Sequence, residues 1–350
     1  ASAGETKEVA KRQARYFCQL AEEIEPQLIK DPGGVGSQRL TAEVDNIRGA
    51  LRYALEAGDP DLGLSLGSCI WRFWQSTDQL TEGREWLDHL LAHPKASDEA
   101  RVKGLTALAG LAYWQADYDG ALARYSEALD YYQSQGDRFN EADTLSSMSL
   151  TAVWNGDLET GERFATEALS ILEELGYREG IARVTAAQGF LLLKQHDYAA
   201  SRTSYAKAFA IARELGDQHL AITILAGVAV STFQLGDRNE ALELALEAVA
   251  EAVQLRNAHL VVWMLDLVAA FAARTAPEGA TRLAGAVDCL RDEAGGGMLL
   301  EPLGLKDVRS IAAQLLSAES LERAWAEGRA MGLEQATDLA RELGGAASML

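Results

Sequence analysis

The chain has few cysteines, few prolines and no long apolar run, and each shortage excludes a class of protein. Its 350 residues include only three cysteines and six prolines. The cysteines, Cys18, Cys69 and Cys289, are odd in number and far apart, so we expect buried free thiols and no disulfide framework. No stretch approaches the roughly 20 consecutive apolar residues of a transmembrane helix. The first residues have no basic flank followed by an apolar segment, which favours a cytoplasmic protein.

Residue patterns that commonly carry catalysis or bind metals are also missing. The five histidines show no zinc-ligand spacing with cysteines or carboxylates, and no Gly-x-Ser-x-Gly pattern is present. The stretch from Gly33 to Leu40 has the glycines of a phosphate-binding loop, but Ser37 stands where that loop needs a lysine. We therefore expect no metal, no cofactor and no enzymatic activity, and an ordinary flexible loop at Gly33.

Basic side chains are outnumbered. Fifty-two acidic residues against 32 lysines and arginines give a formal net charge of −20. Because this charge repels phosphate backbones, we expect no direct binding of nucleic acid by this chain. A hydrophobic content of 48% with 24% charged residues is typical of a folded protein with a sizeable core.

The strongest positive feature is a repeat of 40 residues. Aspartates recur at that spacing, each in a short polar break, at Asp117, Asp157, Asp197 and Asp237. Each unit ends at a glycine, or at the asparagine of Leu255-Arg256-Asn257, residues that suit the left-handed turn after a helix. Between the breaks, apolar residues recur every three or four positions, which predicts helices. One helix pair cannot close a core alone, so neighbouring pairs are expected to stack.

One unit carries the resemblance to a known family. Gln115-Ala116-Asp117-Tyr118, followed by Ala121, Tyr125 and Ala128-Leu129, resembles a tetratricopeptide repeat with long helices. We therefore predict an all-α protein, a right-handed α-solenoid superhelix of tetratricopeptide-like helix pairs. The predicted parts are a helical cap at 1–60, a degenerate first repeat at 61–99, four repeats at 100–260, and degenerate repeats with a helical cap at 261–350.

The flanking segments carry a second resemblance. The run from Leu40 to Leu51 and the helices around Trp325 resemble the sensor region of STAND-class bacterial regulators, many of them LuxR-type. In that family an ATPase module precedes this region, and a helix-turn-helix domain or nothing follows it. Neither is visible in this sequence. The resemblance implies a sensor region whose partners are an effector and the other domains of a parent regulator.

In a tetratricopeptide solenoid the first helix of each pair lines the concave surface, so counting back from the repeated aspartates selects candidate binding residues. The count yields an aromatic ladder with two polar interruptions: Trp71, Trp74, Tyr113, Trp114, Trp154, Phe190, Phe233, Lys194 and Gln234. Lys103, Asp143 and Arg183 are predicted near the rim. Aromatic faces with a few charges suit a peptide, a sugar or an apolar small molecule. Whether Trp114 and Trp154 bind a ligand or only pack stays open, and for Phe190 and Phe233 packing is favoured.

The leading hypothesis is a non-enzymatic sensor that binds a small-molecule effector or a protein segment in this groove. Binding would then bias a nucleotide switch in the parent regulator, since a ligand shifts an equilibrium only through different affinities for its two states. A free-standing scaffold that binds a partner peptide is the alternative. A hydrolase would need converging titratable groups that the sequence does not indicate. No membrane partner is expected.

Overall fold

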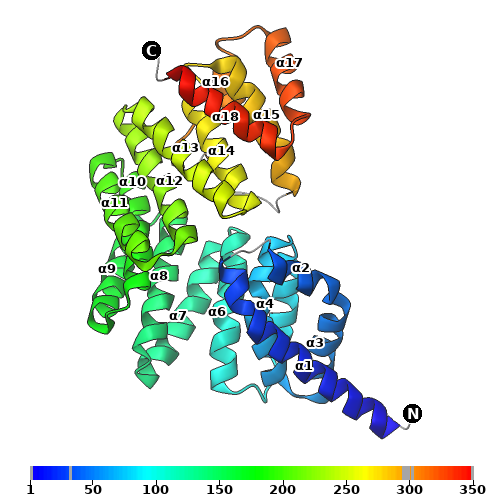
Figure 1. Cartoon of the computed structure of the whole chain (residues 1–350). Helices are drawn as coiled ribbons and strands as arrows, with labels where there is room; N and C mark the ends of the chain where they lie inside the picture. Colours follow the sequence, from blue (N-terminus) through cyan, green and yellow to red (C-terminus); the bar gives the residue numbers. More distant parts are fainter. Residues whose placement is uncertain (1–2, 31–33, 294–299, 301–302, 348–350) are drawn as a thin grey trace. The chain divides into compact units, whose positions relative to one another are not determined.

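The computed structural model describes residues 3–30, 34–293, 300 and 303–347, and the regular elements within them are helices (Figure 1). They are α1 (Ala3–Lys30), α2 (Val35–Ala42), α3 (Val44–Ala57), α4 (Pro60–Ser76), α5 (Leu80–Leu91), α6 (Asp98–Trp114), α7 (Tyr118–Gln135), α8 (Arg138–Trp154), α9 (Leu158–Leu175), α10 (Arg178–Lys194), α11 (Tyr198–Leu215), α12 (Gln218–Leu235), α13 (Arg238–Gln254), α14 (Ala258–Ala272), α15 (Pro277–Glu293), α16 (Val308–Ala312), α17 (Ala318–Arg329) and α18 (Leu333–Ala347). The prediction of an all-α protein is confirmed.

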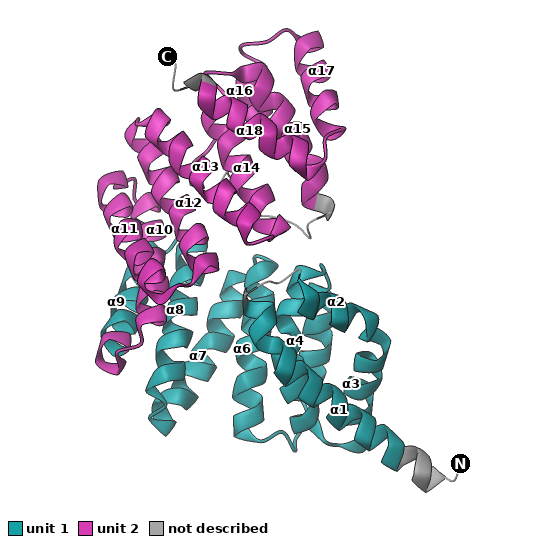
Figure 2. Ribbon diagram, in the orientation of Figure 1, with its two compact units in different colours: residues 1–171 teal, residues 172–350 magenta. Residues whose placement is uncertain are grey.

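The chain divides into two compact units, residues 1–171 and residues 172–350 (Figure 2). In unit 1, α1 packs on α3 and α4, and the helices from α4 to α8 pack in chain order. In unit 2, each helix from α10 to α15 packs on the next, and α15 also contacts α17 and α18. Helices joined by short turns and packed mainly on their sequence neighbours form an α-solenoid, as predicted.

Most turns between the repeat helices share one construction. A left-handed residue ends one helix, and the next residue caps the following helix. Gly136 and Gly216 have φ of +66° and +69°, values that cost little without a β-carbon. The carboxylates of Asp137 and Asp217 then accept hydrogen bonds from backbone N–H groups in the first turns of α8 and α12. The recurring Gly-Asp pair therefore ends one helix and starts the next.

The turn before α14 differs from the prediction. We expected its asparagine to take the left-handed conformation, but Arg256 does so with φ of +56°. Asn257 instead caps α14, and its side-chain oxygen accepts a hydrogen bond of 3.0 Å from the N–H of Leu260. Asparagine is common both as the left-handed residue after a helix and as the N-cap of the next helix, and here it is the N-cap.

The prediction of a flexible loop at the N-terminal glycines is wrong for its described part. Gly33 lies outside the described residues, but Val35–Ala42 form α2. A β-carbon at Gly36 would lie 3.0 Å from Ile24 on α1, and Ser37 is buried. Gly36 therefore lets α2 pack closely on α1, in contrast to the open backbone cradle of a phosphate site.

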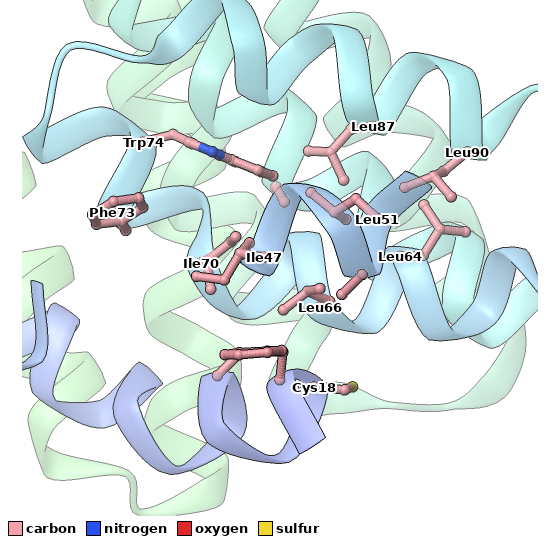
Figure 3. Close-up of a cluster of buried hydrophobic side chains, with 14 of the residues drawn as sticks. Cys18, Ile47, Leu51, Leu64, Leu66, Ile70, Phe73, Trp74, Leu87 and Leu90 are labelled. Carbon is pink, nitrogen blue, oxygen red and sulfur yellow. The ribbon is translucent and has the colours of Figure 1, made fainter. Parts of the chain in front are cut away.

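The core of the N-terminal part of unit 1 is a continuous apolar cluster. Ile47 and Leu51 from α3, Ile70 from α4, and Leu87 and Leu90 from α5 point toward one another (Figure 3). These side chains recur at helical spacing, so each helix turns one apolar stripe inward.

In unit 2, small residues let three helices approach closely. The ring of Tyr205 on α11 lies against Gly189 on α10 and Gly227 on α12. A β-carbon added to those glycines would come within 2.9 Å and 2.4 Å of the ring. The hydroxyl of Ser201 also donates a hydrogen bond of 2.8 Å to the carbonyl of Gly189. One buried tyrosine thus sets the spacing of α10, α11 and α12.

Helix α12 is the one described helix that is long and apolar enough, by composition, to cross a membrane. It packs between α11 and α13, and 61% of its apolar window is buried. Burial of this kind is typical of the central helix of a folded domain.

Candidate binding surface on the first helices

Six of the candidate residues form three pairs at equivalent positions on the first helices. A charged residue and the residue 11 positions later lie on one helix face, because 11 residues make about three turns. These pairs are Lys103 and Trp114 on α6, Asp143 and Trp154 on α8, and Arg183 and Lys194 on α10. Lys103, Asp143 and Arg183 are exposed, although Lys103 forms an ion pair of 3.1 Å with Glu99, which raises the pKa of Lys103.

Trp114 is the most accessible aromatic residue of the predicted ladder, with 51% of its surface exposed. It is the last residue of α6, and its indole meets the ring of Tyr113 edge to face at 5.8 Å. Tyr113 in turn meets Tyr118 of α7 at 5.9 Å, and burial raises the pKa of Tyr113 far above its usual range. The indole therefore packs on Tyr113, which in turn packs on Tyr118, and it still offers a large apolar area to solvent.

Hydrogen bonds place the ends of α6 and α8 along one edge of unit 1. Gln115, directly after Trp114, donates 3.1 Å to the hydroxyl of Thr81 at the start of α5. Asn155, directly after the half-buried Trp154, donates 3.0 Å to the carboxylate of Asp119 at the start of α7. Each tryptophan is thus followed by a residue whose side chain hydrogen-bonds to the second helix of the preceding pair.

Trp71 is half-buried and packs α4 on α6. Its ring covers Gly110, where a β-carbon would lie 2.9 Å from the indole. The guanidinium of Arg72 lies 4.4 Å from the centre of the same ring. Much of this indole is therefore already in contact with protein.

Trp74 does not lie on the surface, and its place in the predicted ladder is wrong. It is 2% exposed and lies within the apolar cluster of unit 1 (Figure 3). A β-carbon at Gly83 of α5 would come within 2.6 Å of its ring. The indole is sealed between α4 and α5, where no ligand reaches it.

The error arises from the register of the degenerate first pair. In a clear repeat, the N–H of Asp117 donates 2.9 Å to the carbonyl of Ala112. In the first pair, the N–H of Gln79 makes the same bond, 2.8 Å, to the carbonyl of Trp74. Gln79, and not Asp78, is therefore equivalent to Asp117, and Trp74 is equivalent to the fully buried Ala112.

The same alignment finds a position that counting from aspartates missed. Ser76 is the last residue of α4, as Trp114 is of α6, and so it takes the place of the indole in the first pair. Its hydroxyl donates 3.2 Å to the carbonyl of Phe73. The backbone hydrogen bond shared by Gln79 and Asp117 locates this position, and the sequence alone does not show that bond.

In unit 2 the predicted aromatic residues pack inside the protein, as favoured from the sequence. Phe190 is 8% exposed. Phe233 of α12 stacks on Phe271 of α14, with ring centres 4.6 Å apart and planes 15° apart. Arg183 and the half-buried Lys194 remain at the two ends of the face on α10.

Gln234 at the end of α12 holds a segment of its own chain. Its side-chain amide donates hydrogen bonds of 3.3 Å and 3.1 Å to the carbonyls of Leu303 and Gly304. The prediction that Gln234 binds a ligand in the groove is therefore corrected, because its amide already binds residues 303 and 304.

The three cysteines are free thiols. Cys18 is buried, which raises its pKa to about 11, while Cys69 and Cys289 are half-buried free thiols. Among the described residues, no three histidine, cysteine, aspartate or glutamate side chains form a group that could hold a metal ion.

Comparison with known proteins identifies the repeat. Residues 180–250, which run from α10 through most of α13, match the family model of the tetratricopeptide repeat. Proteins of Mycobacterium bovis and Mycobacterium tuberculosis that are provisionally named HTH-type transcriptional regulators are 24% identical over 302 residues. The match covers 83% of this chain and 33% of each relative, so the chain spans about a third of their length.

Three solved structures show the fold. A Rap protein in complex with competence and sporulation factor has a TM-score of 0.61 at 13% identity, covering 96% of this chain and 99% of that one. A STAND protein with a tetratricopeptide repeat sensor from Pyrococcus horikoshii has a TM-score of 0.56 at 15% identity, covering 98% of this chain and 55% of that one. The Rap conjugation gene regulator of plasmid pLS20, solved with the Phr* peptide, has a TM-score of 0.55 at 8% identity, covering 95% of this chain and 97% of that one. At such low identity these likenesses establish the fold alone: the chain is an α-solenoid of tetratricopeptide-like helix pairs.

Proposed function

We propose that the chain is a non-enzymatic binding and sensing region of a signal-transducing transcriptional regulator, acting in the cytoplasm. It recognises an effector on the exposed faces of the first helices. The provisional names of the mycobacterial relatives support the regulatory context, and the STAND protein with a repeat sensor supports a sensor role for this fold. A LuxR-type parent with an ATPase module belongs to the same proposal.

The observation that carries the proposal is the exposed indole of Trp114. An apolar ring with 51% of its surface exposed to water, packed edge to face on Tyr113, is a surface that a partner can cover at little conformational cost. Exposed Lys103 on the same helix face and Asp143 on the next first helix supply charges of opposite sign. Together they suit a segment with an apolar side chain flanked by polar groups.

A peptide or protein segment is the effector that we favour over a metabolite. Two structures of the same fold were solved with competence and sporulation factor and with the Phr* peptide. The exposed side chains on α6 and α8 recur from repeat to repeat, which suits an extended chain that contacts several repeats in turn. A formal charge of −20 favours a partner that is not strongly acidic.

The test is selection of binders from a displayed library of random peptides, followed by measurement of their affinity for Trp114→Ala. An aromatic residue at the centre of an interface typically contributes at least about 2 kcal/mol, so we expect a loss of roughly 30-fold or more. Tyr16→Ala is the matched control, because Tyr16 on α1 is an aromatic residue with 55% exposure outside the first helices of the repeats. Its affinity should equal that of the wild type.

Folding is checked on the same samples. Trp114→Ala together with Trp154→Ala should abolish binding while the helical circular dichroism is retained. Peptides that bind equally to the wild type and to Trp114→Ala would contradict the proposal, and unfolding of the double variant would show that the two rings are core residues.

A free-standing scaffold that binds a partner peptide is the second candidate, because the same surface would serve it. The complete reading frame distinguishes the two. A phosphate-binding loop upstream and a helix-turn-helix downstream support the regulator, whereas their absence from the whole gene would favour the scaffold.

A further inference from the structure

The end of α12 already holds a segment of its own chain. Gln234 occupies on α12 the position that Trp114 occupies on α6, counted from the residue that caps each helix. Trp114 is 51% exposed, whereas the side-chain amide of Gln234 donates hydrogen bonds to the carbonyls of Leu303 and Gly304. Gln234 therefore does bind a peptide segment, but that segment belongs to the same molecule.

This segment is held in the way that a groove holds a bound peptide. Leu303 and Leu305 are 7% and 5% exposed, so both apolar side chains are buried. Gly304 between them has φ of +74°, and the N–H groups of the two leucines donate 3.0 Å and 3.3 Å to the carbonyl of Leu300. Main-chain hydrogen bonds and the burial of alternate side chains are also what attach a separate peptide to a protein surface.

The packing beside the segment is incomplete. A cavity of about 570 Å³ is lined by Leu305 and Asp307, in and next to the turn, and by Asp266 on α14 and Arg291 on α15. Atoms that line a cavity lack protein contacts on one side. Burial raises the pKa of Asp266 to about 6 although Arg291 lowers it, and the negative charge of Asp307 raises it further. The cavity and the repulsion between these two carboxylates both weaken the attachment of the segment, so we expect it to detach at a lower cost than the helices.

We propose that residues 303–305 are an internal ligand of the first-helix surface in unit 2, and that a peptide effector displaces them when it extends from α10 onto α12. The effector part of this inference rests on the proposed function, whereas the internal ligand rests on the hydrogen bonds of Gln234. Since the turn presents two leucines around a glycine, the displacing peptide has an apolar side chain on either side of a turn. The internal ligand competes with that peptide and so lowers its apparent affinity.

Hydrogen exchange in the whole chain tests whether the segment opens by itself. The amides of Leu303 and Leu305 should exchange through a local opening, faster than the buried amides of α14 and independently of low urea concentrations. Gln234→Ala removes two hydrogen bonds from the segment, so these two amides should exchange about tenfold faster in this variant. Gln254→Ala is the matched control, because Gln254 is an exposed glutamine at the end of α13, which is the second helix of its pair.

A fluorescently labelled synthetic peptide with the sequence of residues 300–310 tests whether the surface accepts a separate chain. Leu303→Ser weakens the internal copy, so we expect the peptide to bind this variant. The wild type should bind it at least about tenfold more weakly, because the tethered copy competes at a high effective concentration. Adding Gln234→Ala to Leu303→Ser should reduce the affinity about tenfold, and adding Gln254→Ala should leave it unchanged. Circular dichroism checks that Leu303→Ser folds, and the exchange measurements do not depend on that variant.

Exchange of the two leucine amides only by global unfolding would overturn the proposal, as would equal acceleration by the two glutamine variants. So would a folded Leu303→Ser chain that leaves the peptide unbound at about 1 mM, or a wild type that binds it equally well. None of these measurements uses Trp114 or an unidentified effector, so failure of this inference and failure of the peptide surface on α6 and α8 are measured separately.

Discussion

The ring of Tyr205 packs between Gly189 and Gly227, and this packing predicts how Gly227→Ala changes the free energy of unfolding. The new β-carbon would lie 2.4 to 2.5 Å from three atoms of the ring, whereas ordinary carbon contacts begin near 3.5 Å. The ring cannot retreat, because it is 7% exposed and Gly189 lies against its other side. Helices α10 or α12 must therefore move apart by roughly 1 Å, and overpacking of this kind costs about 1–3 kcal/mol.

Alanine also has a higher helix propensity than glycine, which stabilises the folded protein by about 1 kcal/mol. Gly49→Ala isolates that gain, because Gly49 lies inside α3 and a β-carbon there meets nothing within 4 Å. The difference in unfolding free energy between the two variants is therefore the overpacking cost itself, about 1–3 kcal/mol.

Urea denaturation followed by circular dichroism measures both variants. Adding Tyr205→Leu to Gly227→Ala should recover part of the loss, because the smaller side chain leaves room for the new methyl group. If Gly227→Ala stabilises the protein as much as Gly49→Ala does, then the ring does not set the spacing of α10, α11 and α12.

Two further stability predictions concern Asp266 and Ala116. Asp266 has a folded-state pKa of about 6, above the 3.8 of an exposed aspartate, so its contribution is full below pH 4 and is lost as the pH rises through 6. At about 1.4 kcal/mol per unit, the wild type should lose roughly 3 kcal/mol more than Asp266→Asn between pH 4 and 7, and equal losses in urea titrations would refute this. Ala116 has φ of +59°, so Ala116→Gly should stabilise the protein by about 0.5–1 kcal/mol, and a lower denaturation midpoint would count against strain at this turn.

The helix boundaries were predictable because their signals are local. Glycines Gly136 and Gly216 have left-handed φ values and Asp137 and Asp217 cap the next helix, and each pair acts within one turn of chain. Where two adjacent residues can each take either role, the local rule is ambiguous. Asn257 and Asp78 both show this, since Asn257 caps a helix and Asp78 takes the left-handed conformation with φ of +56°.

That ambiguity propagates from the turn to the binding surface. A shift of one residue in the first pair rotates the helix by about 100°, which carries a residue from the surface into the core. Trp74 was therefore predicted beside Trp114, although 2% of one and 51% of the other is exposed. The backbone bond from Gln79 to Trp74 and the packing of Trp74 on Gly83 resolve the register, and neither is visible in the sequence.

The remaining errors and omissions share a second cause, contacts between residues far apart in the sequence. Gln234 was predicted to bind a ligand in the groove because the carbonyls that it binds belong to residues 303 and 304, about 70 positions later. The pairing of Asp266 has the same origin, since its partner Arg291 lies on α15, 25 positions later. One signal was nevertheless present in the sequence: Asp266 is the single acidic residue of the apolar run from Leu260 to Ala272. A buried carboxylate is costly unless it is protonated or paired, so such a lone acidic residue predicts a partner nearby, which here is Arg291.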